Sequence, residues 1–256
     1  MKDGAATAWR WGPPLFALLM LVAVYASGSN RAIFFFFNHF SAYSGDALWA
    51  RITVFGDTAV ILAMLLPWWR KRPDLVWAAL LAAVLATLWT HGLKHLADVP
   101  RPPAVLDAGS FHVIGPAHRA GSFPSGHSTA IFTLVGVMVL TAVAGWQRWA
   151  LLAFAFLVAV SRSVVGVHWP LDLLGGMLGG WLSALGGVWL ARRWSWEQRP
   201  FVRWLSAAIP AIAAALLLVG YKTGYEDAAL MQQGVGAVCL VLWGWGWFLG
   251  QKKFTQ

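Results

Sequence analysis

Charged side chains are scarce in this chain, and acidic ones are the scarcest. Asp and Glu together number 10 in 256 residues, and all charged residues make up only 11%. Hydrophobic residues make up 59%, there are 18 Trp, and the mean hydropathy is +0.63. A water-soluble domain usually has about a quarter of its residues charged. The composition therefore indicates an integral membrane protein.

Cysteine and clustered metal ligands are also lacking. Cys239 is the single cysteine, so no internal disulfide can form, and it says nothing about the redox compartment. His91 and His95 are four residues apart and could pair on a helix, but no nearby Cys or Glu completes a tetrahedral set. Asp98 and Asp107 are too scattered to form a site. We therefore predict no metal and no cofactor.

Long apolar runs are abundant, and they are continuous rather than alternating, which argues against a β-barrel. About 20 apolar residues are needed to cross a bilayer as a helix. The predicted fold is therefore all-α, a polytopic bundle of transmembrane helices. Six spans with interfacial helices at the two ends remain an alternative to eight. The eight predicted segments are 13–28, 53–69, 75–97, 127–145, 149–167, 171–191, 204–220 and 228–250.

The distribution of Lys and Arg predicts the orientation. In a soluble protein a net charge of +9 would suggest nucleic-acid binding. In a membrane protein the side of the membrane on which each Lys or Arg lies matters more than the total. With both termini inside, twelve of the 19 fall on the cytoplasmic side: Lys2, Arg10, Arg70, Lys71, Arg72, Arg148, Arg192, Arg193, Arg199, Arg203, Lys252 and Lys253. The seven others, Arg31, Arg51, Lys94, Arg101, Arg119, Arg162 and Lys222, then face away from the cytoplasm, toward the periplasm or exterior. We expect no nucleic-acid partner.

The N-terminal region has two open alternatives. Residues 24–26 resemble a signal-peptide cleavage site, but we expect the first span to be retained. Residues 30–56 mix aromatic and polar side chains, which suits one amphipathic helix at the outer interface or a plain hydrophobic anchor. The proline-rich loop 98–123 is expected to be irregular and outside the membrane. His112, His118 and Arg119 lie in it and could touch lipid head groups.

Three polar islands, 94–102, 124–127 and 161–172, interrupt the apolar runs where each run meets a loop. They contain three cations, two histidines, a serine, a glycine and a carboxylate, listed as Lys94, Arg101, Arg162, His127, His168, Ser125, Gly126 and Asp172. Cations hold a phosphate, and a histidine oriented by a carboxylate can act as nucleophile or base. The islands together predict a site for phosphoryl transfer through histidine.

Local sequence predicts how these side chains are placed, although each has a plainer interpretation. Ser125 is a natural N-cap, and the N–H groups after it would point at a bound anion. If Pro170 is the first residue of a helix, Asp172 lies in its first turn and can accept the Nδ1–H of His168. Taken alone, Lys94 could be a side chain that extends to the membrane interface, and the pair His168 and Asp172 could be a structural cap.

The ordered motifs K-x6-R-P, P-S-G-H and S-R-x5-H-x3-D resemble the type 2 phosphatidic acid phosphatase superfamily of lipid phosphatases, which is related to bacterial haloperoxidases. The resemblance covers about residues 53–191 and implies a core of six helices with a site at the outer leaflet, which a lipid enters laterally. It implies that His168 attacks phosphorus, Asp172 orients it and His127 protonates the leaving oxygen. Lys94, Arg101 and Arg162 would bind phosphate oxygens, with Ser125 and Gly126 contributing a hydroxyl and an N–H.

The resemblance divides the chain into an N-terminal span with an interfacial segment (1–52), a phosphatase core (53–191), and two extra C-terminal spans with a cytoplasmic tail (192–256). It implies a metal-independent hydrolase acting on a lipid phosphate or pyrophosphate. Undecaprenyl pyrophosphate is the first expectation, phosphatidylglycerol phosphate the second and lipid A phosphate the third. A lipid phosphotransferase and a transporter remain as alternatives, and the oligomeric state stays open.

Overall fold

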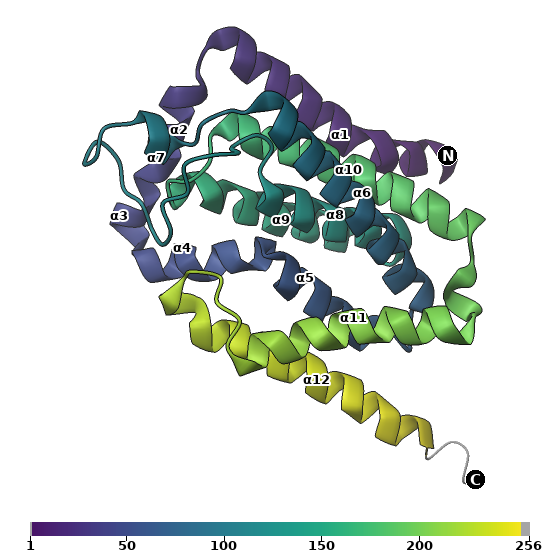
Figure 1. Cartoon of the computed structure of the whole chain (residues 1–256). Helices are drawn as coiled ribbons and strands as arrows, with labels where there is room; N and C mark the ends of the chain where they lie inside the picture. The colour runs from purple at the N-terminus through teal and green to yellow at the C-terminus, as the bar shows by residue number, and fades with distance from the viewer. Residues whose placement is uncertain (1, 252–256) are drawn as a thin grey trace.

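The computed structural model describes residues 2–251, with the side chains of residues 6–245. Helices occupy most of that stretch, which contains no strand, so the predicted all-α class is confirmed (Figure 1). The α-helices are α1 (Lys2–Ser27), α2 (Asn30–Asn38), α3 (Phe40–Ser44), α4 (Asp46–Thr53), α5 (Thr58–Leu65), α6 (Pro73–Ala97), α7 (Pro102–Val105), α8 (Gly126–Thr141), α9 (Trp146–Val164), α10 (Pro170–Arg193), α11 (Pro200–Val219) and α12 (Ala229–Gln251). Short 3-10 turns are η1 (Val54–Gly56), η2 (Leu66–Trp68), η3 (Trp196–Gln198) and η4 (Glu226–Ala228).

Every predicted span contains a helix, but not all of these helices are long. Within residues 2–251, six helices have the length and apolarity to cross a membrane: α1, α6, α9, α10, α11 and α12. The helix α8 is apolar but has only 16 residues, fewer than the 20 or so that a straight span needs. The multi-pass helical character expected from the sequence is therefore confirmed.

The segment predicted as a straight span over 53–69 is instead a bent pair. The axes of Asp46–Gly56 and Thr58–Trp68 meet at 62°. The break is at Asp57, whose backbone is extended and whose carboxylate accepts the N–H of Ala59 at 2.8 Å. Asp57 is thus the N-cap of a new helix, α5, and an N-cap residue leaves the helical backbone conformation.

The segment 30–56, for which an amphipathic helix and a plain anchor were both open, is neither one continuous helix nor a plain anchor. The chain forms α2, α3, α4 and η1 there, and Gly45, with φ of 84°, separates α3 from α4. Buried Asn38 shows that this segment is more than an anchor, because its amide donates to the carbonyls of His112 and Val164 at 2.7 and 3.0 Å. The loop 98–123 is irregular, as expected, apart from the short helix α7.

Glycines on α10 let this helix pack closely against its neighbours at the centre of the bundle. It contacts α8, α6 and α1. A Cβ atom added at Gly176 would lie 2.7 Å from the carbonyl oxygen of Ser125, and one at Gly180 would lie 2.4 Å from that of Thr129. Only hydrogen fits at these two positions. The backbones of α8 and α10 therefore touch, and the start of α8 lies beside the start of α10.

The last two helices form a pair beside the bundle. α11 packs against α12 and α5 (Figure 1). Small and apolar side chains such as Ala213, Ala214 and Leu217 fill the contact. The connection between α11 and α12 returns to the end of the molecule where α4 lies. There the Arg51 side chain donates to the carbonyl oxygen of Asp227 at 3.2 Å.

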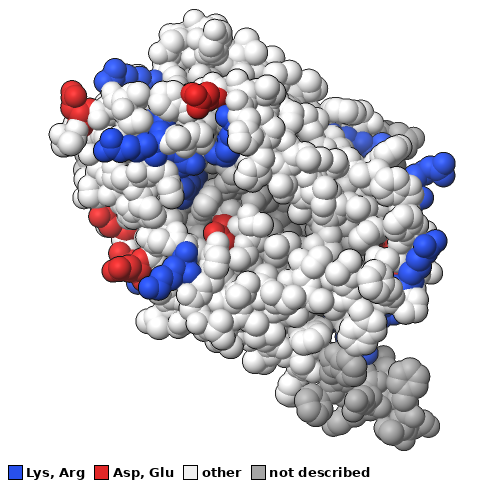
Figure 2. All heavy atoms as spheres, in the orientation of Figure 1, with Lys and Arg blue, Asp and Glu red and all other residues white. Residues whose placement is uncertain are grey.

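On the face shown in Figure 2, most charged side chains lie toward the two ends of the bundle, with a mostly uncharged surface between them. Such a belt is the surface that a bilayer covers. At the end where α2, α3 and α7 gather, Lys and Arg side chains lie along one side of a hollow (Figures 1 and 2). All three polar islands are at that end of their helices.

Candidate active site

One carboxylate oxygen organises the start of α10. Pro170 is the first residue of this helix, so Asp172 lies in its first turn. Its Oδ2 atom lies 3.1 Å from Nδ1 of His168 and accepts the N–H of Trp169 at 2.8 Å. Both members of the His–Asp pair are buried. Because Nδ1 donates its hydrogen to the carboxylate, the lone pair of the neutral imidazole is on Nε2.

A third group bonded to that carboxylate was missed by the sequence reasoning. The hydroxyl of Ser122, which is completely buried, donates a short hydrogen bond to Oδ2 of Asp172. The backbone N–H of Ser122 donates to the carbonyl of Val99 at 2.9 Å. Ser122 therefore joins the loop after α6 to the carboxylate. The only sequence signal was its position two residues before the P-S-G-H motif.

The start of α8 has the predicted cap. Ser125 is the N-cap, and its Oγ accepts the N–H of Ser128 at 3.4 Å. Its own N–H donates to the carbonyl oxygen of Asp172 at 2.9 Å, which joins the second polar island to the third. Gly126 is the first residue of α8, where backbone N–H groups have no partner within the helix. An anion is stabilised at such a position.

His127 is in the first turn of α8, partly exposed, and packs against η1. A Cβ atom added at Gly56 would lie only 2.7 Å from Cβ of His127 and 3.0 Å from its Cδ2. The imidazole of His127 thus lies on the bare backbone of Gly56. The turn between α4 and α5 supports one side of this ring.

Lys94 and Arg101 gather around one strip of loop backbone. The ammonium of Lys94 donates to the carbonyl oxygen of Gly121. Arg101 donates through Nε to the carbonyl of Ala120 at 2.9 Å and through Nη2 to that of Gly121 at 3.4 Å. Two cations that share a carbonyl acceptor are close together, and both side chains are only partly buried. Their remaining donors can bind an anion.

Arg162 is in the last turn of α9 and is buried, with 3% of its surface exposed. Its Nη1 atom donates to Oγ1 of Thr53 at 2.7 Å and to the hydroxyl of Tyr225 at 2.8 Å. Its Nε atom is buried and has no acceptor among the residues that the structure describes. Thr53 and Tyr225 were not recognised from the sequence, because neither lies in a polar island.

Positive charge and burial act together on His168. Burial is the largest cause that lowers the pKa of His168 well below its ordinary value of 6.5, and Arg101, Arg162 and Lys94 add to it. The imidazole is therefore neutral at physiological pH. The pKa of His118, in the loop near these cations, is also lowered, first by desolvation and then by Arg101. With His168 and His118 neutral, the three cations outnumber the one carboxylate of Asp172, and a phosphate would balance the surplus of positive charge.

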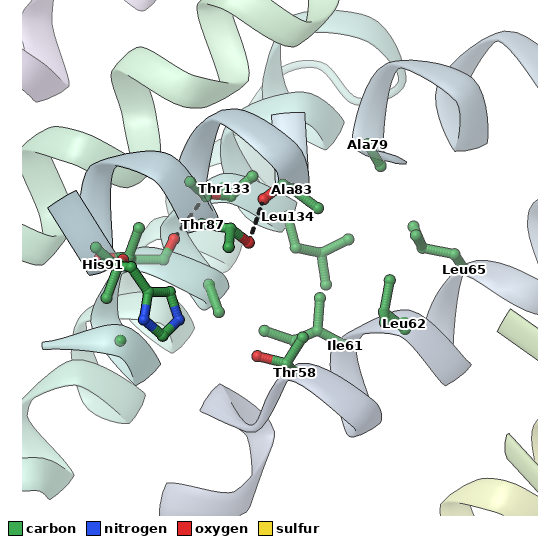
Figure 3. A pocket seen from close by; sticks show the side chains of 15 residues that line it. Thr58, Ile61, Leu62, Leu65, Ala79, Ala83, Thr87, His91, Thr133 and Leu134 are labelled. Carbon is green, nitrogen blue, oxygen red and sulfur yellow. Dashed lines mark hydrogen bonds between the residues drawn. The ribbon is translucent and has the colours of Figure 1, made fainter. Parts of the chain in front are cut away.

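An apolar groove of about 140 Å³ begins beside Gly126 and runs between α5, α6 and α8. Figure 3 shows its lining, with Ile61, Leu62 and Leu65 on one wall and the short side chains of Ala79 and Ala83 opposite. The other lining residues are Thr58, Ala86, Thr87, Thr90, His91, Thr129, Ala130, Thr133 and Leu134. The end of the groove beside Gly126 also includes Thr90 and His91, which lie one helical turn before Lys94 on α6. The groove therefore leads from the cation cluster into the apolar part of the bundle.

The remaining candidates from the sequence do not join the site. His91 and His95 are exposed on α6, and among residues 2–251 no three His, Cys, Asp or Glu side chains are grouped as metal ligands would be. His112 lies with Nε2 2.8 Å from Oδ2 of Asp46, so its contact is within the protein. Asp98, in the left-handed conformation with φ of 39°, ends α6, and Asp107 is exposed in the loop.

Comparison with known proteins places this site in a family. The PAP2 superfamily model matches residues 75–200. The chain is 37% identical over 130 residues to the Escherichia coli protein named "Putative undecaprenyl-diphosphatase YbjG", covering 48% of this chain and 60% of that protein's length. It is 29% identical over 187 residues to an undecaprenyl-diphosphatase of Sulfolobus acidocaldarius, covering 67% and 87% of the two chains.

Two further matches extend the comparison. A lipid A 1-phosphatase of Rhizobium etli is 29% identical over 163 residues, covering 55% of this chain and 69% of the relative. The crystal structure of Aquifex aeolicus LpxE superposes with a TM-score of 0.56 and 28% identity, covering 62% of this chain and 94% of LpxE. The matched region of the family model contains all three polar islands, and residues 75–200 of this chain are a PAP2 superfamily domain with the PAP2 membrane phosphatase fold.

Proposed function

We propose that this protein is a lipid phosphatase that hydrolyses a membrane lipid phosphate or pyrophosphate through a phosphohistidine intermediate. One observation carries the proposal: a buried imidazole, bonded at Nδ1 to Asp172, shares one end of the bundle with three cations. A nucleophile and its orienting carboxylate beside phosphate-binding cations are the parts that phosphoryl transfer needs. The names of the relatives support the same reaction class.

The proposed reaction has two steps. In the first, the Nε2 lone pair of His168 attacks phosphorus, the bond from phosphorus to the leaving oxygen breaks, and His127 gives that oxygen a proton. In the second, water attacks the phosphohistidine, His127 takes the proton of the water, and phosphate leaves with the restoration of His168. Asp172 keeps the proton on Nδ1 and stabilises the positive charge that the ring gains.

The charge that spreads over the phosphoryl oxygens has fixed partners in this scheme. Lys94, Arg101 and Arg162 bind the oxygens, and the α8 start with Ser125 and Gly126 adds N–H groups and the hydroxyl. These guanidinium and ammonium groups fill the role that Mg²⁺ has in many other phosphoryl-transfer enzymes, so we propose a reaction without metal. Removal of one such donor typically costs about 10² to 10³ in rate.

The groove between α5, α6 and α8 supports a lipid as substrate. It joins the polar end at Gly126 to walls made of Ala, Ile and Leu (Figure 3). An apolar chain would lie in it while the phosphate reaches Lys94 and Arg101. We propose that the substrate enters laterally from the outer leaflet, and that undecaprenyl pyrophosphate is preferred, as the names of two relatives suggest. Lipid A phosphate is the second candidate, because another relative is named a lipid A 1-phosphatase.

We propose a bacterial inner-membrane location with the site facing the periplasm. The loops 69–72 and 194–199 lie at the end opposite the site, and they carry or adjoin six cations: Arg70, Lys71, Arg72, Arg192, Arg193 and Arg199. Lys and Arg prefer the cytoplasmic side of a membrane. The end that holds His168 then faces outward.

The test is phosphate release by the purified full-length protein in detergent, with undecaprenyl pyrophosphate, phosphatidylglycerol phosphate and lipid A compared side by side in excess EDTA. We expect release from at least one lipid, fastest from undecaprenyl pyrophosphate, with no loss in EDTA. Loss of release in EDTA that Mg²⁺ restores would contradict the reaction without metal. Transfer of labelled phosphate to a second lipid, with none to water, would show a phosphotransferase instead.

A further inference from the structure

The loop between α11 and α12 reaches the phosphate-binding side chains although it lies far along the chain. Tyr225, at the start of η4, is 6% exposed, and its hydroxyl accepts a hydrogen bond from Nη1 of Arg162 at 2.8 Å. Its ring centroid lies 5.8 Å from Cζ of the same guanidinium. The C-terminal helix pair, which the sequence left without a role, thus contacts the candidate active site directly.

Close packing fixes the position of Tyr225. A Cβ atom added at Gly115 would lie 2.7 Å from Cε1 of Tyr225, and one at Gly224 would lie 2.4 Å from Cγ of Pro116. Its ring also belongs to a buried cluster with Val164 and other side chains of α4, α9 and the adjoining loops. The ring cannot move without displacing the loop 115–116, so its hydroxyl is presented to Arg162 at a defined place.

The hydrogen bonds of Arg162 leave one edge of its guanidinium free for a ligand. An arginine side chain has five N–H donors, of which Nη1 carries two. Both of these are used, by Thr53 and by Tyr225. Nε, which is buried, has no acceptor among the described residues. The Nε and Nη2 donors form the planar fork that binds two phosphate oxygens at once.

We propose that Tyr225 is a positioning residue, which with Thr53 fixes Nη1 of Arg162 so that the opposite edge of the guanidinium faces the substrate phosphate. This inference rests on the proposed function, because it assigns Arg162 the phosphate. Both hydroxyls come from outside residues 75–200, the region that matches the PAP2 model. The C-terminal helix pair is therefore part of the working site rather than a separate anchor.

The test uses Tyr225→Phe in the full-length protein, which removes the hydroxyl and keeps the ring. We expect kcat/KM to fall about tenfold to a hundredfold, the usual loss for a hydrogen bond to a charged group. Binding of orthovanadate, a phosphate mimic, measured by tryptophan fluorescence, should weaken by a similar factor. Thr53→Val should behave alike, and Thr53→Ser, which keeps the hydroxyl, should restore most of the activity.

Tyr221→Phe is the matched control, since it makes the same change in the same loop. Its hydroxyl donates to Asp57 at 3.4 Å and not to Arg162. We expect this variant to keep its vanadate affinity and kcat/KM within about twofold. Equal losses in Tyr221→Phe and Tyr225→Phe would show a general effect of the loop and would overturn the proposal.

A double-mutant cycle with Arg162→Lys separates positioning from folding. Lysine has no Nη1 atom for Tyr225 to hold, so Tyr225→Phe should have little further effect on vanadate affinity in that background. An equal loss in both backgrounds, or no loss in the native one, would refute the role of Tyr225. Vanadate binding can be measured even if the protein hydrolyses none of the lipids. Failure of the proposed function therefore appears as absent turnover by the native protein, whereas failure of this inference appears in the cycle.

Discussion

The Cα atom of Gly56 lies against the His127 side chain so closely that a methyl group there would be 2.7 Å from Cβ of His127. Gly56→Ala should therefore displace the imidazole. A shift of about 1 Å in a catalytic group can cost on the order of a hundredfold, so we expect kcat to fall by roughly that factor. The measurement is phosphate release from undecaprenyl pyrophosphate. Gly234→Ala, at a glycine with open space around it, is the control and should stay near the native rate.

His168→Ala should abolish turnover while the protein stays folded. Loss of the nucleophile in enzymes with comparable triads costs on the order of 10⁴- to 10⁶-fold, and no other described imidazole is bonded to Asp172. A rapid-quench experiment with labelled substrate should trap an acid-labile phosphoprotein in the native enzyme and none in the variant. Substantial activity without His168 would remove it as the nucleophile.

Asp172→Asn should slow the enzyme less than the loss of His168. The amide has one oxygen in place of two, yet Oδ2 now accepts from Trp169 and Ser122 and lies at hydrogen-bond distance from His168. The imidazole can then carry its proton on Nε2, which blocks attack in part of the molecules. Single-turnover rates give the comparison, with Asp107→Asn in the exposed loop as the control. A variant as inactive as His168→Ala would mean that the carboxylate does more than orient the ring.

His127→Ala should distinguish substrates by their leaving groups. An alkoxide leaves badly without a proton, whereas a lipid phosphate leaves as a stable anion. We expect a monophosphate lipid to lose about 10² to 10⁴ in rate, the usual contribution of general acid catalysis, and a pyrophosphate lipid to lose clearly less. Rates for the two lipids, measured on the same preparation, decide the matter. Equal losses would argue against the acid role.

The pH profile should reflect the low pKa of His168. Only the neutral ring is nucleophilic, and burial with the nearby Arg101, Arg162 and Lys94 keeps the ring neutral well below pH 6.5. As the pH falls through 6.5, kcat/KM for a pyrophosphate lipid should therefore hold, and the acid limb should appear only below it. In Arg101→Gln the pKa of His168 should rise, because a cation beside it is lost, and the acid limb should move to higher pH. Profiles from about pH 4 to 8 test both points, and an unchanged limb would contradict this electrostatic coupling.

Sequence patterns revealed the residues whose chemistry is distinctive. Lys94, Arg101, Arg162 and the histidines stand out because charge is rare in apolar runs, and Pro170 predicts the helix start that places Asp172 near His168. The His–Asp contact followed from that local rule and is present at 3.1 Å. The roles of these side chains stay predictions until the variants are measured.

Residues of common type were not predictable in the same way. Ser122, Thr53 and Tyr225 reach the site through contacts between segments that are remote in the chain, and no spacing signals such contacts. The bend at Asp57 depends on a single side-chain cap within an otherwise apolar run. Hydrophobicity detects the run but not the break. For the same reason the composition of residues 30–56 did not reveal the interruption at Gly45.

The close contact between α8 and α10 has a consequence for the geometry of the reaction. His127 and His168 belong to different helix starts, and the separation of those starts is set where the backbone at Gly176 meets Ser125. A side chain at this glycine would push the two helices apart by roughly the width of a methyl group. The absence of a side chain at Gly176 therefore helps to set the distance between His127 and His168, across which the phosphorus atom must fit.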